Sequence, residues 1–180
     1  MLDTIRRECL SCTNCELSKT RTNVVFGRGN EKARLLFVGE APGANEDATG
    51  MPFVGAAGKL LDAYLTAVGL GADDYYIANI LKCRPPQNRD PNPEEIAACT
   101  PFLFRQIGDI DPKLIVCLGR IAAMRLIKED FRITKEHGTV FEKDGKNYMA
   151  VYHPAALLRD PHKKEDMLLD FKKIRQLLDK

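Results

Sequence analysis

Four cysteines have the spacing of a metal site. Cys12 and Cys15 form a Cys-x-x-Cys pair, while Cys83 and Cys99 flank a Pro-rich loop and the segment that follows it. A turn of that length can aim two thiolates at one centre. Four thiolates suit either zinc or a [4Fe–4S] cluster, and spacing alone leaves both open. Disulfides are rare in a reducing cytosol, so clustered cysteines in such a chain favour metal binding.

Two further cysteines are predicted to be bystanders. Cys9 forms a second Cys-x-x-Cys with Cys12, but it falls at the end of a helix expected over residues 2–9. Cys117 lies in an apolar run, where a free cysteine behaves as a small hydrophobic residue. The predicted ligand set is therefore Cys12, Cys15, Cys83 and Cys99.

Polar segments rich in Gly or Pro follow each of the strands that the sequence predicts. Apolar runs predict buried strands, and periodicity or capping predicts helices between them. The strands are expected at residues 35–39, 75–80, 114–119 and 148–152. Helices are expected at 2–9 and 56–68, in a segment that begins at 93, in a segment that follows the third strand and ends at about 127, and around 167–178. This alternation predicts an α/β fold, a three-layer α/β/α sandwich around a mainly parallel four-stranded sheet. Open sheets bind ligands beyond the carboxyl ends of their strands, so the loops after Val38, Ile77, Leu118 and Val151 predict one shared site.

The composition is that of one compact domain spanning residues 1–180. Hydrophobic residues make up 44% of the chain, and the formal net charge is only +2, so nucleic-acid binding would need a local basic face. No apolar run approaches the ~20 residues of a membrane span. The first ten residues contain no apolar segment of the signal-peptide type, which predicts a cytoplasmic protein.

Four motifs resemble the family 4 uracil-DNA glycosylases, the iron–sulfur enzymes of bacteria and archaea. They are GEAPG at 39–43, GMPFVG at 50–55, YIAN at 76–79 with KCRPP at 82–86, and YHPA at 152–155. The motifs occur in the same order, and the resemblance runs from about Cys12 to Arg159. It implies a uracil-DNA glycosylase fold and hydrolysis of the N-glycosidic bond, which releases free uracil and leaves an abasic site. It also implies the four predicted cysteines as ligands and a [4Fe–4S] cluster in preference to zinc.

Two residues suit the recognition of a uracil that has been flipped out of the DNA stack. Phe53 offers a flat apolar surface for the base, although a phenylalanine is also an ordinary core residue. Asn79 offers a donor and an acceptor, which match O4 and N3–H of uracil. Because a buried strand end is a poor place for an asparagine without a partner, Asn79 is predicted to read the base edge.

His153 is predicted to stabilise the leaving base. Negative charge grows on uracil as the glycosidic bond breaks, and a donor aimed at O2 stabilises it. The resemblance assigns the same role to the His-Pro motif. A lone histidine is often structural, but the position of His153 at a strand end favours a functional role.

The group that activates water is less clearly marked. In the family 1 enzymes an Asp follows the position that matches Glu40, whereas Ala41 stands there in this chain. Glu40 and Asn79 remain as the residues that orient a water, and Ala41 is expected to line the base pocket. Glu46 and Asp47 are expected in the same loop, where they would shape the pocket against the methyl group of thymine; a solvated loop is the alternative.

Basic and apolar residues near the site predict contacts with uracil-containing DNA, single- or double-stranded, by a monomer. Leu157 and Leu158 follow the His-Pro motif and suit a wedge that holds base steps open. The alternative is the first turn of a helix with core leucines. One basic cluster consists of Arg159, His162, Lys163 and Lys164. Arg84 and Arg89 form another, and both clusters are suited to phosphates.

Three rival functions remain open from the sequence. One is a relative that traps uracil covalently, which the absence of any His between Arg84 and Cys99 disfavours. Another is a zinc-stabilised nucleotide-binding module without catalysis. The third is an electron-transfer protein, which fits poorly because Cys-x-x-Cys occurs only once among the proposed ligands.

Overall fold

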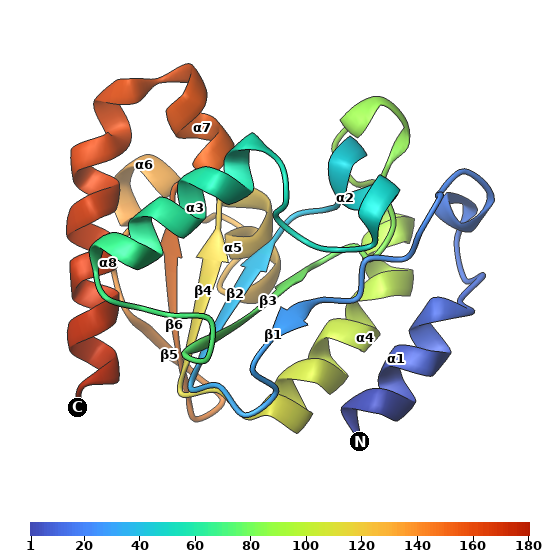
Figure 1. Cartoon of the computed structure of the whole chain (residues 1–180), viewed down its shortest axis with the longest axis horizontal. Coiled ribbons are helices and arrows are strands. Elements are labelled where there is room, and N and C mark those ends of the chain that lie inside the picture. The colour runs from blue at the N-terminus through green and yellow to red at the C-terminus, as the bar shows by residue number, and fades with distance from the viewer.

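A single mixed sheet of six strands forms the centre of the molecule (Figure 1). The computed structural model describes all residues from Met1 to Lys180. The strand order is β1-β3-β2-β4-β6-β5. The strands are β1 Arg28–Gly29, β2 Leu35–Gly39, β3 Tyr75–Asn79, β4 Leu114–Leu118, β5 Phe141–Lys143 and β6 Lys146–Val151. The helices are α1 Leu2–Leu10, α2 Ala44–Thr49, α3 Ala56–Ala67, α4 Pro93–Ile110, α5 Arg120–Leu126, α6 Ile133–Glu136, α7 Pro154–Arg159 and α8 Lys164–Leu178, with short 3₁₀ turns at Glu16–Lys19, Pro86–Asn88 and Pro161–Lys163.

The four predicted strands form the parallel centre of the sheet. β3, β2, β4 and β6 pair in parallel, and antiparallel β1 and β5 add one strand at each edge. The prediction of a mainly parallel sheet is confirmed, but the count of four strands was wrong. β1 and β5 contain only two and three residues, too few to show a strand period.

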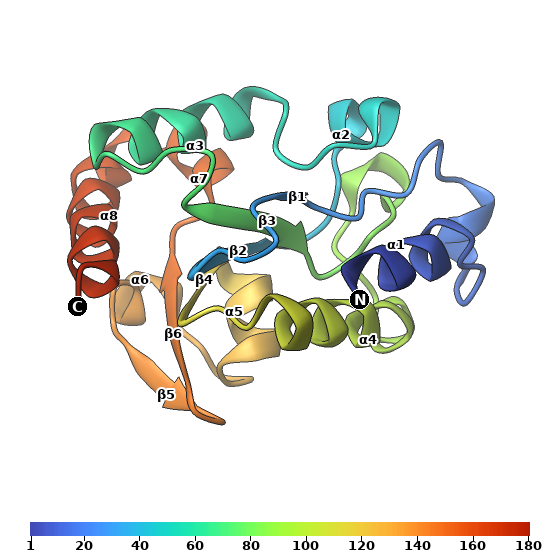
Figure 2. The ribbon, with the colours of Figure 1, turned by 60° about the horizontal axis from the view of Figure 1, so that its bottom comes forward.

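Helices cover both faces of this sheet, so the three-layer arrangement is confirmed (Figure 2). Leu36 and Val38 of β2 face a core shared with α1, α4 and α5. Leu35 and Phe37 face the opposite core, which α3, α7 and α8 complete. Every residue of β2, β3 and β4 is buried, as expected for strands covered on both sides.

Helix α4 is fixed at the start by a reciprocal cap. The side chain of Asn92 accepts the backbone N–H of Glu95 at 3.0 Å, and the Glu95 carboxylate accepts the N–H of Asn92 at 3.0 Å. Arg89 donates two hydrogen bonds to the same carboxylate, at 2.8 and 2.9 Å. The loop that follows Cys83 is therefore anchored to α4 at the point where it borders the cleft.

Helix α2 was not predicted from the sequence. Its residues, Ala44–Thr49, were expected to form a loop, and the helix ends at Gly50 in the left-handed conformation. Six residues with alanine, asparagine and acids carry too short a pattern to indicate a helix. No helix in the structure is long and apolar enough to cross a membrane.

Candidate active site

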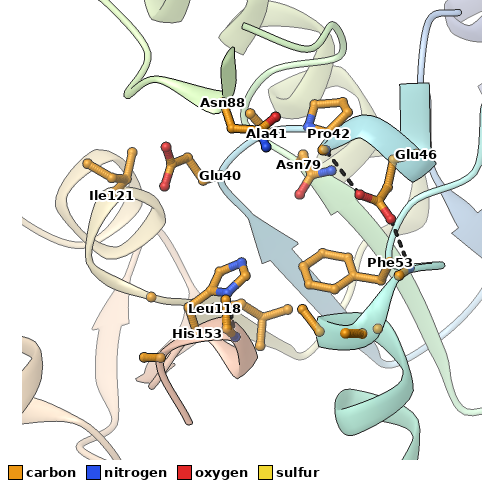
Figure 3. A pocket seen from close by; sticks show the side chains of 18 of the residues that line it. Glu40, Ala41, Pro42, Glu46, Phe53, Asn79, Asn88, Leu118, Ile121 and His153 are labelled. Carbon is orange, nitrogen blue, oxygen red and sulfur yellow. Dashed lines mark hydrogen bonds between the residues drawn. The ribbon is translucent and has the colours of Figure 1, made fainter. Parts of the chain in front are cut away.

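A cleft of about 740 Å³ opens at the carboxyl ends of the parallel strands. The loops that follow β2, β3, β4 and β6 all contribute to it, as the sequence predicted. Glu40, Phe53, Asn79 and His153 come from different segments and surround one space (Figure 3). The residues singled out for base recognition and cleavage therefore lie in one site.

Phe53 forms part of the cleft wall in a strained backbone conformation. It is buried, and its φ of +54° lies in the left-handed region that residues with a Cβ seldom adopt. The chain packs closely around it: a Cβ on Gly58 would lie 1.9 Å from the carbonyl oxygen of Phe53. A Cβ on Gly39 would lie 2.7 Å from Cζ of its ring. Strain of this kind persists only where the surroundings impose it, and it is concentrated at functional sites.

Asn79 presents an unused acceptor beside this ring. The residue is 2% exposed, and its Oδ1 is buried without a hydrogen-bond partner. A Cβ on Gly39 would lie 2.4 Å from Oδ1, so the amide and the Phe53 ring meet over the same glycine. A buried acceptor without a partner costs about 1–3 kcal/mol. Such a cost indicates a ligand that supplies the missing donor.

His153 caps helix α7 through one nitrogen of its ring. Nδ1 accepts the backbone N–H of Ala155 at 3.1 Å, so the proton of the neutral imidazole lies on Nε2. Burial is the main factor that lowers the pKa of His153 to about 4; the Arg159 cation acts in the same direction and the Glu46 carboxylate against it. The ring is therefore neutral at pH 7 and offers Nε2–H as a donor.

Glu40 lies across the cleft from His153, next to Ala41 (Figure 3). Burial raises the pKa of the Glu40 carboxyl, the Asp90 carboxylate raises it further, and the Arg120 guanidinium opposes both. Asp90 and Arg120 were not predicted from the sequence. Asp90 lies in the loop before α4 and Arg120 is the first residue of α5, so they form no motif with Glu40. A partly buried carboxylate with a shifted pKa in a cleft is a candidate to bind or activate water.

Glu46 lines the cleft, but its carboxylate is occupied by the backbone. Oε1 accepts the N–H of Gly43 and Oε2 accepts the N–H of Gly55, each at 3.0 Å (Figure 3). Oε2 also accepts the N–H of Val54 at 3.0 Å. This carboxylate therefore holds the loop that carries Phe53. Glu46 was predicted to shape the pocket, and these bonds give it an indirect means to do so.

Asp47 does not line the cleft, so its predicted role against the thymine methyl group was wrong. Its Oδ1 accepts the backbone N–H groups of Thr22 and Asn23, at 2.9 and 3.2 Å. The adjacent position on a short helix turns this side chain away from the cleft. It ties α2 to the segment that follows the N-terminal cysteines instead.

The four predicted cysteine ligands line one small apolar pocket of about 20 Å³. Three N–H donors reach their sulfurs: Asn14 N to Cys12 at 3.4 Å, Arg21 Nη1 to Cys83 at 3.4 Å and Lys82 N to Cys99 at 3.2 Å. Such donors stabilise negative charge on thiolates. No three His, Cys, Asp or Glu side chains are placed to hold a single metal ion. Cys9 borders the same pocket and is buried, whereas Cys117 is buried in β4.

Comparison with known proteins assigns the chain to a family. The sequence model of the uracil DNA glycosylase superfamily matches residues 26–178. A type-4 uracil-DNA glycosylase of Archaeoglobus fulgidus is 52% identical over 99% of this chain and 94% of its own length. This chain belongs to the type-4 uracil-DNA glycosylases. A type-4 enzyme of Sulfurisphaera tokodaii is 45% identical over 98% of the chain and 84% of its own length, and a type-5 enzyme of Thermus thermophilus is 34% identical over 72% and 68%.

The leucines predicted to enter DNA have different environments in this type-4 family member. Leu157 is 0% exposed and packs in the core with α3 and α8, so its assignment to DNA was wrong. Leu158 is 54% exposed. Both residues belong to helix α7 rather than a loop, and successive helical positions point in different directions. Only Leu158 remains as a candidate wedge.

The predicted basic contacts border the cleft to different extents. Arg159 and Arg89 line it, but Arg89 is paired with Glu95. Arg84 donates to the side chain of Asn88 at 2.7 Å, and Asn88 also lines the cleft. Lys163, which was noted only as part of a basic cluster, lines the cleft as well. The cleft therefore has positive groups on the segments after β3 and after β6, and such groups bind phosphates.

Proposed function

We propose that this chain flips uracil out of DNA and hydrolyses its N-glycosidic bond, releasing free uracil and leaving an abasic site. The observation that carries the proposal is the buried, unpartnered Oδ1 of Asn79 beside the Phe53 ring. A flat base with a donor on its edge fits that combination. Uracil N3–H supplies the donor, and the Asn79 amide N–H faces O4. The base lies flat against Phe53.

In this proposal, His153 and Glu40 provide the groups for bond cleavage. As the bond between N1 and C1′ breaks, its electron pair moves onto uracil, and the charge spreads to O2. The neutral His153 ring donates Nε2–H toward O2 and stabilises that charge in the transition state. Glu40 orients a water whose oxygen bonds to C1′ of the sugar, and the water loses a proton. The leaving uracil gains a proton, so the products are the neutral base and the abasic sugar.

One assay tests this activity and separates it from its rivals. The protein is incubated with an oligonucleotide that contains one uracil, and free uracil and abasic sites are measured. Release of both in equal amounts supports hydrolysis. Tight binding without release would contradict catalysis, and a covalent adduct of protein and DNA would instead indicate trapping.

We also propose that Cys12, Cys15, Cys83 and Cys99 hold a [4Fe–4S] cluster. The four cysteines border one pocket, and three N–H donors point at their sulfurs. In a [4Fe–4S] cluster each thiolate binds a different iron, so the four sulfurs need not converge on one point. Bound there, the cluster would crosslink the N-terminal segment to the loop that begins at Cys83 and to α4.

Iron and sulfide content tests the cluster. The purified protein should be brown and contain about four irons and four sulfides per chain, the stoichiometry of a [4Fe–4S] centre. Cys83→Ser should lower the iron content. Cys9→Ser is the matched control, because Cys9 is buried against the same pocket and is not among the proposed ligands. Stoichiometric zinc with no iron would contradict the proposal.

We also propose that the cleft accepts uracil in both single- and double-stranded DNA. Arg159 and Lys163 supply charge for the backbone, and Leu158 supplies exposed apolar area next to them. A wedge is needed only where a flipped base leaves a gap in a duplex. Comparing excision from the two forms tests this division of roles.

A further inference from the structure

An arginine outside the cleft holds the backbone of the residue proposed to stack on uracil. Arg28 Nε donates to the carbonyl oxygen of Pro52 at 2.9 Å, and Nη2 donates to the carbonyl oxygen of Phe53 at 3.3 Å. The side chain of Arg28 is 26% exposed and is not part of the cleft wall. Its guanidinium therefore affects the pocket only through the main chain of Pro52 and Phe53.

The opposite side of the same turn is held by a carboxylate. Glu46 accepts the N–H groups of Val54 and Gly55, which immediately follow Phe53. Arg28 thus binds carbonyls at and before Phe53, while Glu46 binds amides after it. Together they oppose relaxation of the φ of +54°, because that rotation would reorient the peptide groups that both side chains hold.

The segment that carries Arg28 is built to lie close to the sheet. β1 has only two residues, and a Cβ on Gly29 would lie 2.4 Å from the carbonyl oxygen of Tyr75 in β3. Arg28 itself pairs with Ile77 of β3. This strand is too short to stabilise the sheet edge by much, but it places one guanidinium beside the turn. The planar fork of arginine can bind two carbonyls at once, which a lysine cannot do in the same geometry.

We infer that Arg28 is a positioning residue for uracil binding, which keeps the Phe53 ring at the distance from Asn79 and His153 that a flat base requires. The inference rests on the proposed function, since it assigns Phe53 to the base. It assigns no contact between Arg28 and the substrate. Loss of Arg28 should allow the turn to relax, so the stacking surface would shift while the groups that break the bond remain in place.

Arg28→Gln and Arg28→Lys, with Asp62→Asn as the matched control, test this role. Asp62 Oδ1 is the other partner of the guanidinium, at 4.0 Å from Nη2. No hydrogen bond in the structure joins Asp62 to the turn that carries Phe53. Calorimetry measures binding of free uracil, and single-turnover assays measure the rate and the half-saturating concentration of DNA. Thermal unfolding shows whether each variant is folded.

Arg28→Gln should weaken uracil binding by about tenfold or more, as expected for the loss of bonds from a charged donor that fix the stacking surface. The uracil affinity of Arg28→Lys should lie between those of Arg28→Gln and the unaltered protein, because a lysine can still form one hydrogen bond to a carbonyl. Asp62→Asn should bind uracil normally. Unchanged uracil binding in a folded Arg28→Gln variant would overturn the inference, and so would equal weakening in all three variants.

The same measurements keep the two proposals apart. If the unaltered protein released no uracil from DNA, the proposed function would fail, whatever the arginine variants did. If it released uracil and folded Arg28→Gln matched it in both binding and rate, only the positioning role of Arg28 would fail. A lower rate with normal binding of free uracil would also contradict that role, because the effect must pass through the stacking surface.

Discussion

The rings of Phe53 and His153 lie with their centroids 5.8 Å apart and their planes tilted by 31°. A base that lies against Phe53 in the proposed complex is therefore next to the imidazole. Asn79 lies beside the same phenylalanine, over Gly39. In the proposed complex, Asn79 would recognise one edge of the base, and His153 would stabilise the leaving group at another.

His153→Ala should lower the single-turnover rate of uracil release by about 10²–10³-fold, the usual effect of removing one donor to a developing anion. Binding of free uracil should change much less, because the charge on O2 develops only as the bond breaks. His162→Ala is the control: His162 is exposed in the turn after α7. Full activity of His153→Ala would remove this histidine from the mechanism.

Protonation of Glu40 should cause the fall in rate on the acidic side of the pH–rate profile, its acidic limb. The pKa of Glu40 is raised by burial and by Asp90, whereas that of His153 is lowered to about 4. As the pH falls, Glu40 is therefore protonated first and loses its ability to orient water. Asp90→Asn removes a charge that raises the pKa of Glu40, so the limb should move to lower pH.

Arg120→Gln provides the opposite test of the same limb. The Arg120 cation lowers the pKa of Glu40, and its removal should move the limb to higher pH. Glu40→Gln should lower the plateau by about 10²-fold, within the range for a residue that assists proton transfer. Shifts in the same direction for Asp90→Asn and Arg120→Gln would contradict this assignment.

Asn79→Ala should lower uracil excision without lowering the stability of the fold. The variant removes a buried acceptor that has no partner, so the free energy of unfolding should not fall by the 1–3 kcal/mol that a broken buried hydrogen bond costs. Uracil excision should fall by about 10²-fold, since two edge contacts are lost. Denaturant unfolding and single-turnover assays measure the two effects. A clear loss of stability with normal excision would mean that the side chain serves the fold.

The sequence predicted the parallel strands and the site at their ends because long buried runs and polar loops carry those features directly. It did not predict β1, since two residues show no period, although Gly27-Arg28-Gly29 could have drawn attention to Arg28. The hairpin of β5 and β6 did carry a local signal, the Asp144-Gly145 turn, in which both residues have positive φ. The charges around Glu40 come from the loop before α4 and from the start of α5, which meet only in the folded chain.

The exposure of Leu158 and the burial of Leu157 give adjacent leucines different predicted effects. Leu158→Ala should lower excision of uracil from a duplex by about tenfold or more. A flipped base leaves a gap in the stack, and an apolar side chain that fills the gap offsets part of the few kcal/mol that unstacking costs. Excision from single strands should be nearly unchanged, since no stacked partner strand closes the gap. Phosphate contacts from Arg159 act on both substrates, so they should not alter this ratio.

Leu157→Ala serves as the matched control on the same helix. Its side chain packs in the core with α3 and α8, so the substitution should lower the free energy of unfolding by about 2–5 kcal/mol. At a temperature where the variant is folded, its ratio of duplex to single-strand excision should match that of the unaltered protein. If Leu157→Ala changed that ratio and Leu158→Ala did not, the buried leucine would have to leave the core on DNA binding, and Leu158 would have no role as the wedge.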